Sequence, residues 1–174
     1  MGETVITVPL AELQHLFDEM GLRNGDDEHD RSSSPFAITL TEVSDVRIGA
    51  RVDFRGSHQR PGGLVAGPVL FSIVDACGWL ATVSRLAPGS EAMTIDCMIR
   101  YLAPVPSGSL VVEAIVLRAG KRSVVSAVTI STVDDPDRAR VHAVVSFAPV
   151  ANGLDGVRQR GHGATSAQVV SGTT

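Results

Sequence analysis

The chain has 174 residues, of which 44% are hydrophobic and 20% are charged, and its formal net charge is −4. This composition suits one domain with a buried core, and the acidic balance argues against general binding to nucleic acid or to anionic membranes. Its two cysteines have neither metal-ligand nor disulfide spacing, and Met1–Leu10 lacks a signal-peptide pattern, so we expect a cytoplasmic protein.

The N-terminal part of the chain predicts one short helix followed by a loop. Apolar residues recur at helical spacing from Leu10 to Met20, and Gly21 then provides a stop. Residues 24–34 are polar and charged without periodicity, which is typical of a loop. We therefore expect an N-terminal helix-and-loop segment over residues 1–34, with the helix packed as a lid or at an edge of the domain. Strands are expected over 36–40 and 43–54, before a turn-rich stretch over 55–63.

The segment from Gly62 to Leu86 predicts one long apolar helix with a single carboxylate, Asp75, near its middle. Pro68 suits the first helical position, and Gly67 before it lets a ligand approach the free N–H groups of the first turn. A membrane span is rejected because Asp75 would cost about 2.5–3.5 kcal/mol near the bilayer centre. Asp75 is either a functional acid or a carboxylate that contacts water or a neighbouring strand.

Four strand-like runs follow this helix, over residues 92–102, 109–119, 122–133 and 138–150, and turn residues separate them. Strands joined by short turns form an antiparallel meander. The sequence therefore predicts an α+β domain over residues 35–150, in which an antiparallel sheet wraps one long central helix. Residues 151–174 are rich in Gly, Ser and Thr, and we expect a flexible tail.

A set of motifs between Val43 and Pro149 resembles a known family. The matching residues are Gly63, Gly67, Asp75, the strand residues Thr94-Ile95-Asp96-Cys97 and Tyr101-Leu102-Ala103-Pro104, Gly108, and the turn Gly120-Lys121-Arg122. This pattern resembles the hotdog-fold acyl-CoA thioesterases of the phenylacetyl-CoA and 4-hydroxybenzoyl-CoA type. The chain departs from that pattern twice: Arg60 replaces an Asn, and Ala66-Gly67-Pro68 replaces His-Gly-Gly.

The resemblance implies an active site at the start of the central helix. In such a site the Gly67 backbone N–H polarises the thioester carbonyl, and Asp75 acts as nucleophile or general base. No cofactor is implied other than coenzyme A as part of the substrate. The resemblance also implies a homodimer or a dimer of dimers, in which the acid comes from one chain and the other catalytic groups come from the next.

Further residues are candidates for substrate binding. Lys121 and Arg122 are the preferred ligands for the CoA phosphates, with Arg60 and Arg100 as additional cations. The alternative is that the Lys121–Arg122 turn is an ordinary solvated turn.

The remaining candidates are Gly63, Pro68, Ser72, Trp79 and Tyr101. For Ser72 the alternative is a hydrogen bond to a carbonyl of its own helix, and for Trp79 it is a place in the core or at a dimer contact.

Other functions are less well supported. The chain has no Gly-x-Ser-x-Gly elbow, phosphate-binding loop, dinucleotide motif or metal-ligand cluster. Hotdog dehydratases pair an acid with a His, and no His lies on the central helix. The serious alternative is a hotdog protein that binds acyl-CoA or another acyl ligand without hydrolysing it, which the loss of the family Asn and His favours. Asp75 favours the enzyme, because an acyl-binding groove has no need of a carboxylate. Neither the acyl group nor the choice between CoA and a carrier protein follows from the sequence.

Overall fold

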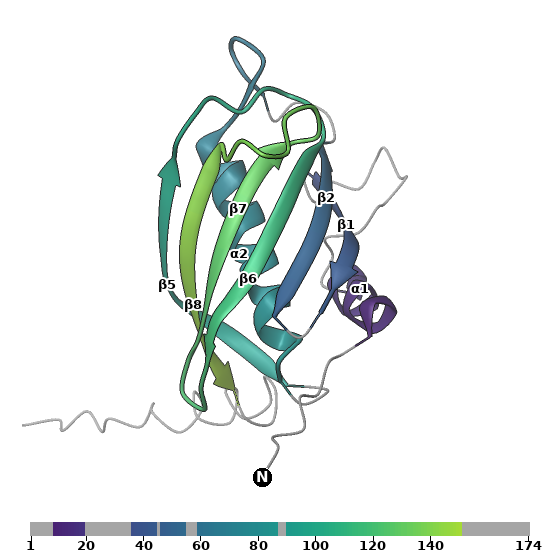
Figure 1. Ribbon diagram of the computed structural model, residues 1–174, viewed down its shortest axis with the longest axis vertical. Coiled ribbons are helices and arrows are strands. Elements are labelled where there is room, and N and C mark those ends of the chain that lie inside the picture. The colour runs from purple at the N-terminus through teal and green to yellow at the C-terminus, as the bar shows by residue number, and fades with distance from the viewer. Residues whose placement is uncertain (1–8, 20–35, 45, 55–58, 87–89, 151–174) are drawn as a thin grey trace, which may run out of the picture.

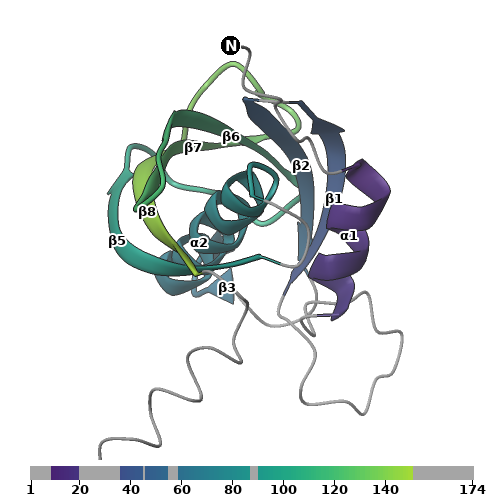
Figure 2. The ribbon, with the colours of Figure 1, turned by 90° about the horizontal axis from the view of Figure 1, so that it is seen from below.

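An antiparallel sheet wraps one long helix in the computed structural model, which describes residues 9–19, 36–44, 46–54, 59–86 and 90–150 (Figures 1 and 2). The six-stranded sheet has the order β1-β2-β6-β7-β8-β5, and every neighbouring pair is antiparallel. The predicted α+β hotdog architecture is confirmed. The strands are β1 (Phe36–Val43), β2 (Arg47–Phe54), β5 (Glu91–Tyr101), β6 (Leu110–Ala119), β7 (Val124–Thr132) and β8 (Val141–Val150).

The central helix α2 (Gly67–Val83) fills the inside of the curved sheet. Alternate residues of each strand point toward it, which gives the burial pattern of β8, where Val141, Ala143, Val145 and Phe147 are all buried. Helix and sheet lie close together at Gly78, where an added Cβ would be 2.4 Å from Val145 Cγ1 and 3.1 Å from Phe147 Cε2. Only glycine fits at this position without displacing β8.

The helix is shorter than the stretch from Gly62 to Leu86 that its hydrophobicity predicts. Gly62 and Gly63 have φ values of 99° and 72°, which a right-handed helix does not contain. They form the turn of a small hairpin between β3 (Gln59–Arg60) and β4 (Leu64–Val65). Ala66 is still extended, with φ −71° and ψ 141°, and Pro68 lies in the first helical turn, as predicted.

The two edges of the sheet differ. The N-terminal helix α1 (Leu10–Glu19) packs against the outer edge of β1, as predicted, and buries Leu13 completely. There the Gln14 amide group pairs with the strand backbone: its Nε2 donates to Ile38 O at 3.2 Å, and its Oε1 accepts from Leu40 N at 2.8 Å. At the other edge, β5 pairs with β8 alone among the described strands, which leaves its outer side without a backbone partner.

Three strands depart from simple alternation, and the first of them is β1, which has a bulge at Thr41 between the paired residues Leu40 and Glu42. The run predicted over 43–54 is divided, because Ser44 N donates to Arg47 O in a turn between β1 and β2. A bulge in β5 falls at Ile95, between the paired residues Thr94 and Asp96, and another in β6 falls at Leu117. Each bulge switches the faces to which the flanking side chains point.

None of the helices in the described part of the chain has the length and hydrophobicity needed to cross a bilayer.

Candidate active site

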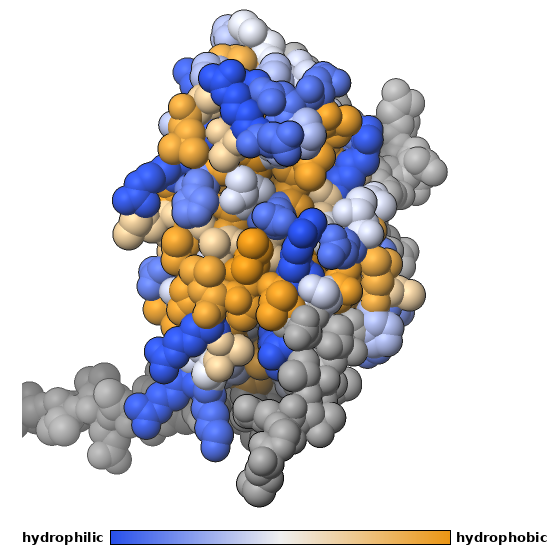
Figure 3. Space-filling view, in the orientation of Figure 1, coloured by the Kyte–Doolittle hydropathy of each residue, from blue (hydrophilic) through white to orange (hydrophobic). Residues whose placement is uncertain are grey.

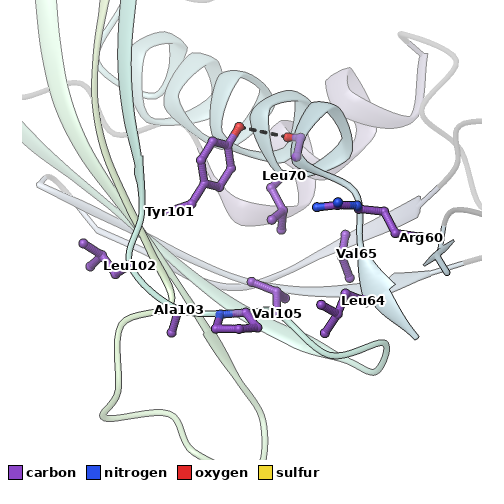
Figure 4. A pocket seen from close by; sticks show the side chains of 10 residues that line it. Arg60, Leu64, Val65, Leu70, Tyr101, Leu102, Ala103 and Val105 are labelled. Carbon is purple, nitrogen blue, oxygen red and sulfur yellow. Dashed lines mark hydrogen bonds between the residues drawn. The ribbon is translucent and has the colours of Figure 1, made fainter. Parts of the chain in front are cut away.

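A cavity of about 480 Å³ opens at the start of α2, where β4, α2 and the end of β5 meet (Figure 4). Most of its lining is apolar and includes Leu64, Val65, Leu70, Leu102 and Val105. The polar groups are few: the Gly67 backbone, the Tyr101 hydroxyl and the Arg60 guanidinium. An apolar cavity with a few polar groups is typical of a small-molecule site.

Gly67 presents an unused backbone donor to this cavity. The Tyr101 hydroxyl donates to the Gly67 carbonyl oxygen at 3.1 Å, which ties the end of β5 to the start of the helix. The Gly67 N–H has no acceptor among the described residues, and Pro68 has no N–H at all. The helix dipole adds partial positive charge at this end. The first turn of α2 is therefore suited to hold a carbonyl oxygen on which negative charge develops.

Arg60 is the cation of this cavity. It lies on β3, paired with Leu64 of β4, and Figure 4 shows its guanidinium directed toward the start of α2. No carboxylate among the described residues forms an ion pair with Arg60. Its charge is therefore available to an anionic or strongly polar ligand group.

Asp75 lies on α2, and its carboxylate is half-buried. Thr94 of β5 holds it: Thr94 Oγ1 donates to Asp75 Oδ1 at 2.9 Å. Thr94 belongs to the matching strand motif, but the sequence does not identify it as the partner of Asp75, because simple strand alternation puts it on the same face as Asp96, away from the helix. The bulge at Ile95 turns Thr94 toward Asp75 and leaves one carboxylate oxygen free of this hydrogen bond.

Cys97 is the other reactive group near Asp75. Burial raises the pKa of its thiol, and the carboxylates of Asp75 and Asp96 raise that pKa further. Cys77, fully buried on α2, has a pKa raised to about 12 by desolvation. A thiol with a raised pKa is a poor nucleophile at neutral pH, so Asp75 is the stronger candidate for chemistry.

Within one chain the two halves of this predicted site are far apart. Gly67 and Asp75 are eight residues apart on the same helix, which corresponds to a rise of about 12 Å. A thioester carbonyl bound to the Gly67 N–H is out of reach of the Asp75 carboxylate of that chain.

The other candidates are spread along the molecule. Gly63 is at the hairpin turn before the cavity, and Pro68 follows Gly67. Ser72 Oγ donates to the Pro68 carbonyl at 3.0 Å, and Trp79 is a core residue whose Nε1 donates to Glu91 Oε1 at 2.7 Å.

The candidate phosphate ligands do not gather at the Gly67 cavity. Lys121 and Arg122 are exposed at the β6–β7 turn, at the opposite end of the molecule from the start of α2 (Figure 1). Arg100 pairs with His142 on the outer face of the sheet, whereas its neighbour Tyr101 faces the helix. His58, the histidine closest to the site in sequence, lies outside the described residues.

Comparison with known proteins agrees with this architecture. Residues 62–139 match the family model of the Thioesterase superfamily. An esterase candidate of Saccharolobus solfataricus is 37% identical over 84 residues, which are 48% of this chain and 54% of that relative. The match therefore spans about half the length of the curated relative.

Solved structures share the fold. A thioesterase of Haemophilus influenzae superposes with a TM-score of 0.65 at 20% identity, covering 84% of this chain and 93% of that one. A Streptococcus mutans protein, solved bound to acetyl-CoA, superposes with a TM-score of 0.60 at 16% identity, covering 72% and 97%. At these identities the structures establish the hotdog fold alone.

Proposed function

We propose that this chain hydrolyses the thioester bond of an acyl- or aryl-CoA, which the match of residues 62–139 to the family model of the Thioesterase superfamily supports. The observation that carries this proposal is the pair of functional groups on one helix: a free N–H at Gly67 and a Thr94-bound carboxylate at Asp75. A protein that only binds acyl groups needs no carboxylate there.

In the proposed mechanism the Gly67 N–H binds the thioester carbonyl oxygen. The Asp75 carboxylate either attacks the carbonyl carbon or removes a proton from a water molecule that attacks it. The negative charge that develops on the carbonyl oxygen is stabilised by the N–H and by the helix dipole. The carbon–sulfur bond then breaks, and coenzyme A leaves as its thiolate. After direct attack, water hydrolyses the acyl–Asp75 anhydride and releases the carboxylic acid; on the water route the acid forms directly, and Asp75 returns its proton to the thiolate. Thr94 donates a hydrogen bond to one oxygen of Asp75, which leaves the other oxygen for the reaction.

The distance between Gly67 and Asp75 supports a site shared by two chains. When two copies pair along the free edge of β5, a two-fold axis makes the paired strands antiparallel. The start of α2 in one chain is then on the same side as the far end of the partner, and Gly67 of one chain faces Asp75 of the other. Apolar side chains beside this edge favour such a contact: Ile95 is 54% exposed, Tyr101 52% and Phe71 40%.

The same pairing accounts for Lys121 and Arg122. In one chain they lie at the opposite end from the Gly67 cavity, but antiparallel pairing brings the partner's turn toward that cavity. Two cations on an exposed turn suit the phosphates of CoA. The acetyl-CoA bound to the Streptococcus mutans protein of the same fold supports a CoA ester as the substrate here.

Binding without hydrolysis is the second candidate function, and Arg60 favours it. Arg60 lines the cavity in place of the Asn of the family pattern that the sequence resembles, and Ala66 takes the place of its His. Such a site holds an acyl-CoA firmly through charge even when the water for hydrolysis is poorly oriented.

The test is thiol release from short, long and aryl CoA esters. We expect Asp75→Asn to lower kcat by at least about a hundredfold on every ester that the wild type hydrolyses. Thr94→Val is expected to lose about tenfold and Thr94→Ser to keep most of the rate, because serine retains the hydroxyl donor. A wild type that binds these esters and releases no thiol would establish the binding function instead.

A further inference from the structure

The hairpin that carries Arg60 is fixed to the part of the cavity wall that follows β5. Val65 N donates to Val105 O at 2.9 Å, and Ser107 N donates to Gly63 O at 2.9 Å. Within the hairpin, Gly63 N donates to Arg60 O at 3.1 Å. These bonds hold the base of the Arg60 side chain at the cavity, from where its guanidinium is directed toward the start of α2 (Figure 4).

Arg60 is the one charged side chain among the described residues that line the cavity. Its guanidinium is exposed, and water solvates it. An acyl group that fills the cavity displaces this water, and a chain that ends in a methyl group offers the guanidinium nothing in exchange. A chain that ends in a carboxylate replaces the water with charge-assisted hydrogen bonds. The cavity therefore favours an acyl group with an anionic end.

The place of Arg60 separates this anion from the phosphates of coenzyme A. In the proposed mechanism the thioester carbonyl is bound at Gly67, which lines the same cavity as Arg60. Because the long pantetheine arm holds the phosphates away from the thioester, a cation in this cavity is too close to the thioester to reach them. The phosphates are left to exposed cations such as Lys121 and Arg122.

Two groups of the proposed mechanism suit this cation less well. The thioester carbonyl oxygen is uncharged before the attack, and the Gly67 N–H and the helix dipole already stabilise it. An ion pair between Arg60 and Asp75 of the partner subunit would stabilise the ionised carboxylate and so weaken it as a base. A substrate carboxylate has neither disadvantage, and its two oxygens match the planar fork of donors on a guanidinium.

We propose that the cavity binds an acyl group that ends in a carboxylate, so that the substrates are CoA thioesters of dicarboxylic acids. This inference rests on the proposed function, which places the thioester carbonyl at Gly67. The apolar walls, which include Leu64, Leu70 and Val105, enclose the methylene chain, and Arg60 binds the carboxylate with two hydrogen bonds. The volume of about 480 Å³ has room for a glutaryl or an adipyl group. Hydrolysis releases the dicarboxylate and coenzyme A.

The test compares pairs of esters that have the same number of carbons and differ at the chain end. These pairs are glutaryl-CoA with valeryl-CoA, and adipyl-CoA with hexanoyl-CoA. Thiol release is corrected for the rate without enzyme, because dicarboxylic thioesters also cleave by ring closure. We expect the wild type to prefer the carboxylated member of at least one pair by about tenfold or more in kcat/KM. Arg60→Gln should abolish most of this preference and keep the rate on the methyl-ended ester within about threefold.

A charge reversal and a matched control sharpen the test. Arg60→Glu should prefer 6-aminohexanoyl-CoA to adipyl-CoA, because the charge on the cavity wall has changed sign. Arg138→Gln is the control, since it removes one positive charge from the β7–β8 loop, outside the residues that line the cavity. This loop lies at the top of Figure 1, and Figure 3 shows hydrophilic side chains over it. The control should keep the wild-type preference.

Failure of this inference differs from failure of the proposed function. A wild type that hydrolyses both members of each pair equally well, or prefers the methyl-ended ester, is a thioesterase without the proposed selectivity. An equal loss on both members in Arg60→Gln would also overturn the inference, because it would mean that Arg60 acts on the carbonyl or on the acid. If no ester is hydrolysed, calorimetric binding of adipyl-CoA and hexanoyl-CoA decides: tighter binding of adipyl-CoA that is lost in Arg60→Gln supports the inference, and equal affinities refute it.

Discussion

Two inactive variants that complement each other would demonstrate the shared active site. Asp75→Asn removes the acid and leaves the Gly67 donor intact. Gly67→Pro removes the N–H donor and leaves the acid intact. The second change suits the local backbone, because Ala66 already has the extended ψ of 141° that a residue before proline adopts. Its added Cβ meets Tyr101 Oη at an ordinary 3.5 Å.

The rise of about 12 Å between Gly67 and Asp75 along α2 means that each complete site takes Gly67 from one chain and Asp75 from the other. The expected loss and recovery of rate follow from this arrangement. Each variant alone should lose about a hundredfold or more in kcat, since an oxyanion donor is worth about 10²–10³. When equal amounts exchange subunits at random, about half of the dimers are hybrids, and each hybrid has one intact site of two. The mixture should therefore recover about a quarter of the wild-type rate.

The assay is thiol release before and after subunit exchange between chains that carry different affinity tags. Mixing Asp75→Asn with the double variant Gly67→Pro/Asp75→Asn is the matched control, because no hybrid of this pair contains an acid. No recovery in the first mixture, despite isolation of the doubly tagged hybrid, would mean that one chain's own Gly67 and Asp75 act together and that the helix geometry has been misread.

Three further predictions concern the fold. Gly78→Ala should lower the free energy of unfolding by roughly 1–2 kcal/mol, because the clash with Val145 outweighs the gain in helix propensity; urea melts that show no coupling with Val145→Ala would contradict this. The hydrogen bond from the Arg51 guanidinium is the main cause that lowers the pKa of Asp53 below 3.8. The stability this gives is present above pH 3.8 and is lost as the pH falls through the lowered value, so urea melts of wild type and Asp53→Asn should differ at pH 6 and converge in acid, whereas a constant difference would exclude this origin. Gln14→Ala should cost about 1–2 kcal/mol in the same assay, since two backbone groups of β1 lose their partner, and Glu12→Ala, on the same helix, should cost little.

Much of the fold is predictable from local sequence patterns, namely strand alternation and turn residues. Alternation over 110–115 and 141–147 reflects strands with one face on the helix, and the turn residues between successive strands predict hairpins. Where alternation fails, an additional residue is the cause. Ile95 is such a residue, and the bulge it forms sends Thr94 to the helix and Asp96 to the outer face. Hydrophobicity alone gives no sign of it.

The candidate site is predictable only in part, because some of its features are local in the sequence and others depend on contacts between distant elements. Gly67 and Asp75 stand out because a donor-rich helix start and a lone carboxylate are local features. Hydrophobicity overestimates the helix, since Leu64 and Val65 are as apolar in a short strand as in a helix, and the positive φ of Gly62 and Gly63 decides between them. Contacts such as Trp79 with Glu91 depend on which strand lies beside which turn of α2, and no pattern along the chain contains that information.

The difference between the two edges of the sheet limits how many chains can pair strand to strand. A sheet with two open edges can pair with a further copy at each edge, and repeated pairing of this kind builds a filament. Here the Gln14 amide occupies backbone positions of β1 that an incoming strand would need, so the proposed pairing along β5 would join two chains and stop there. In the proposed assembly, one glutamine on α1 would thus block the second edge of the sheet and limit edge-to-edge pairing to two chains.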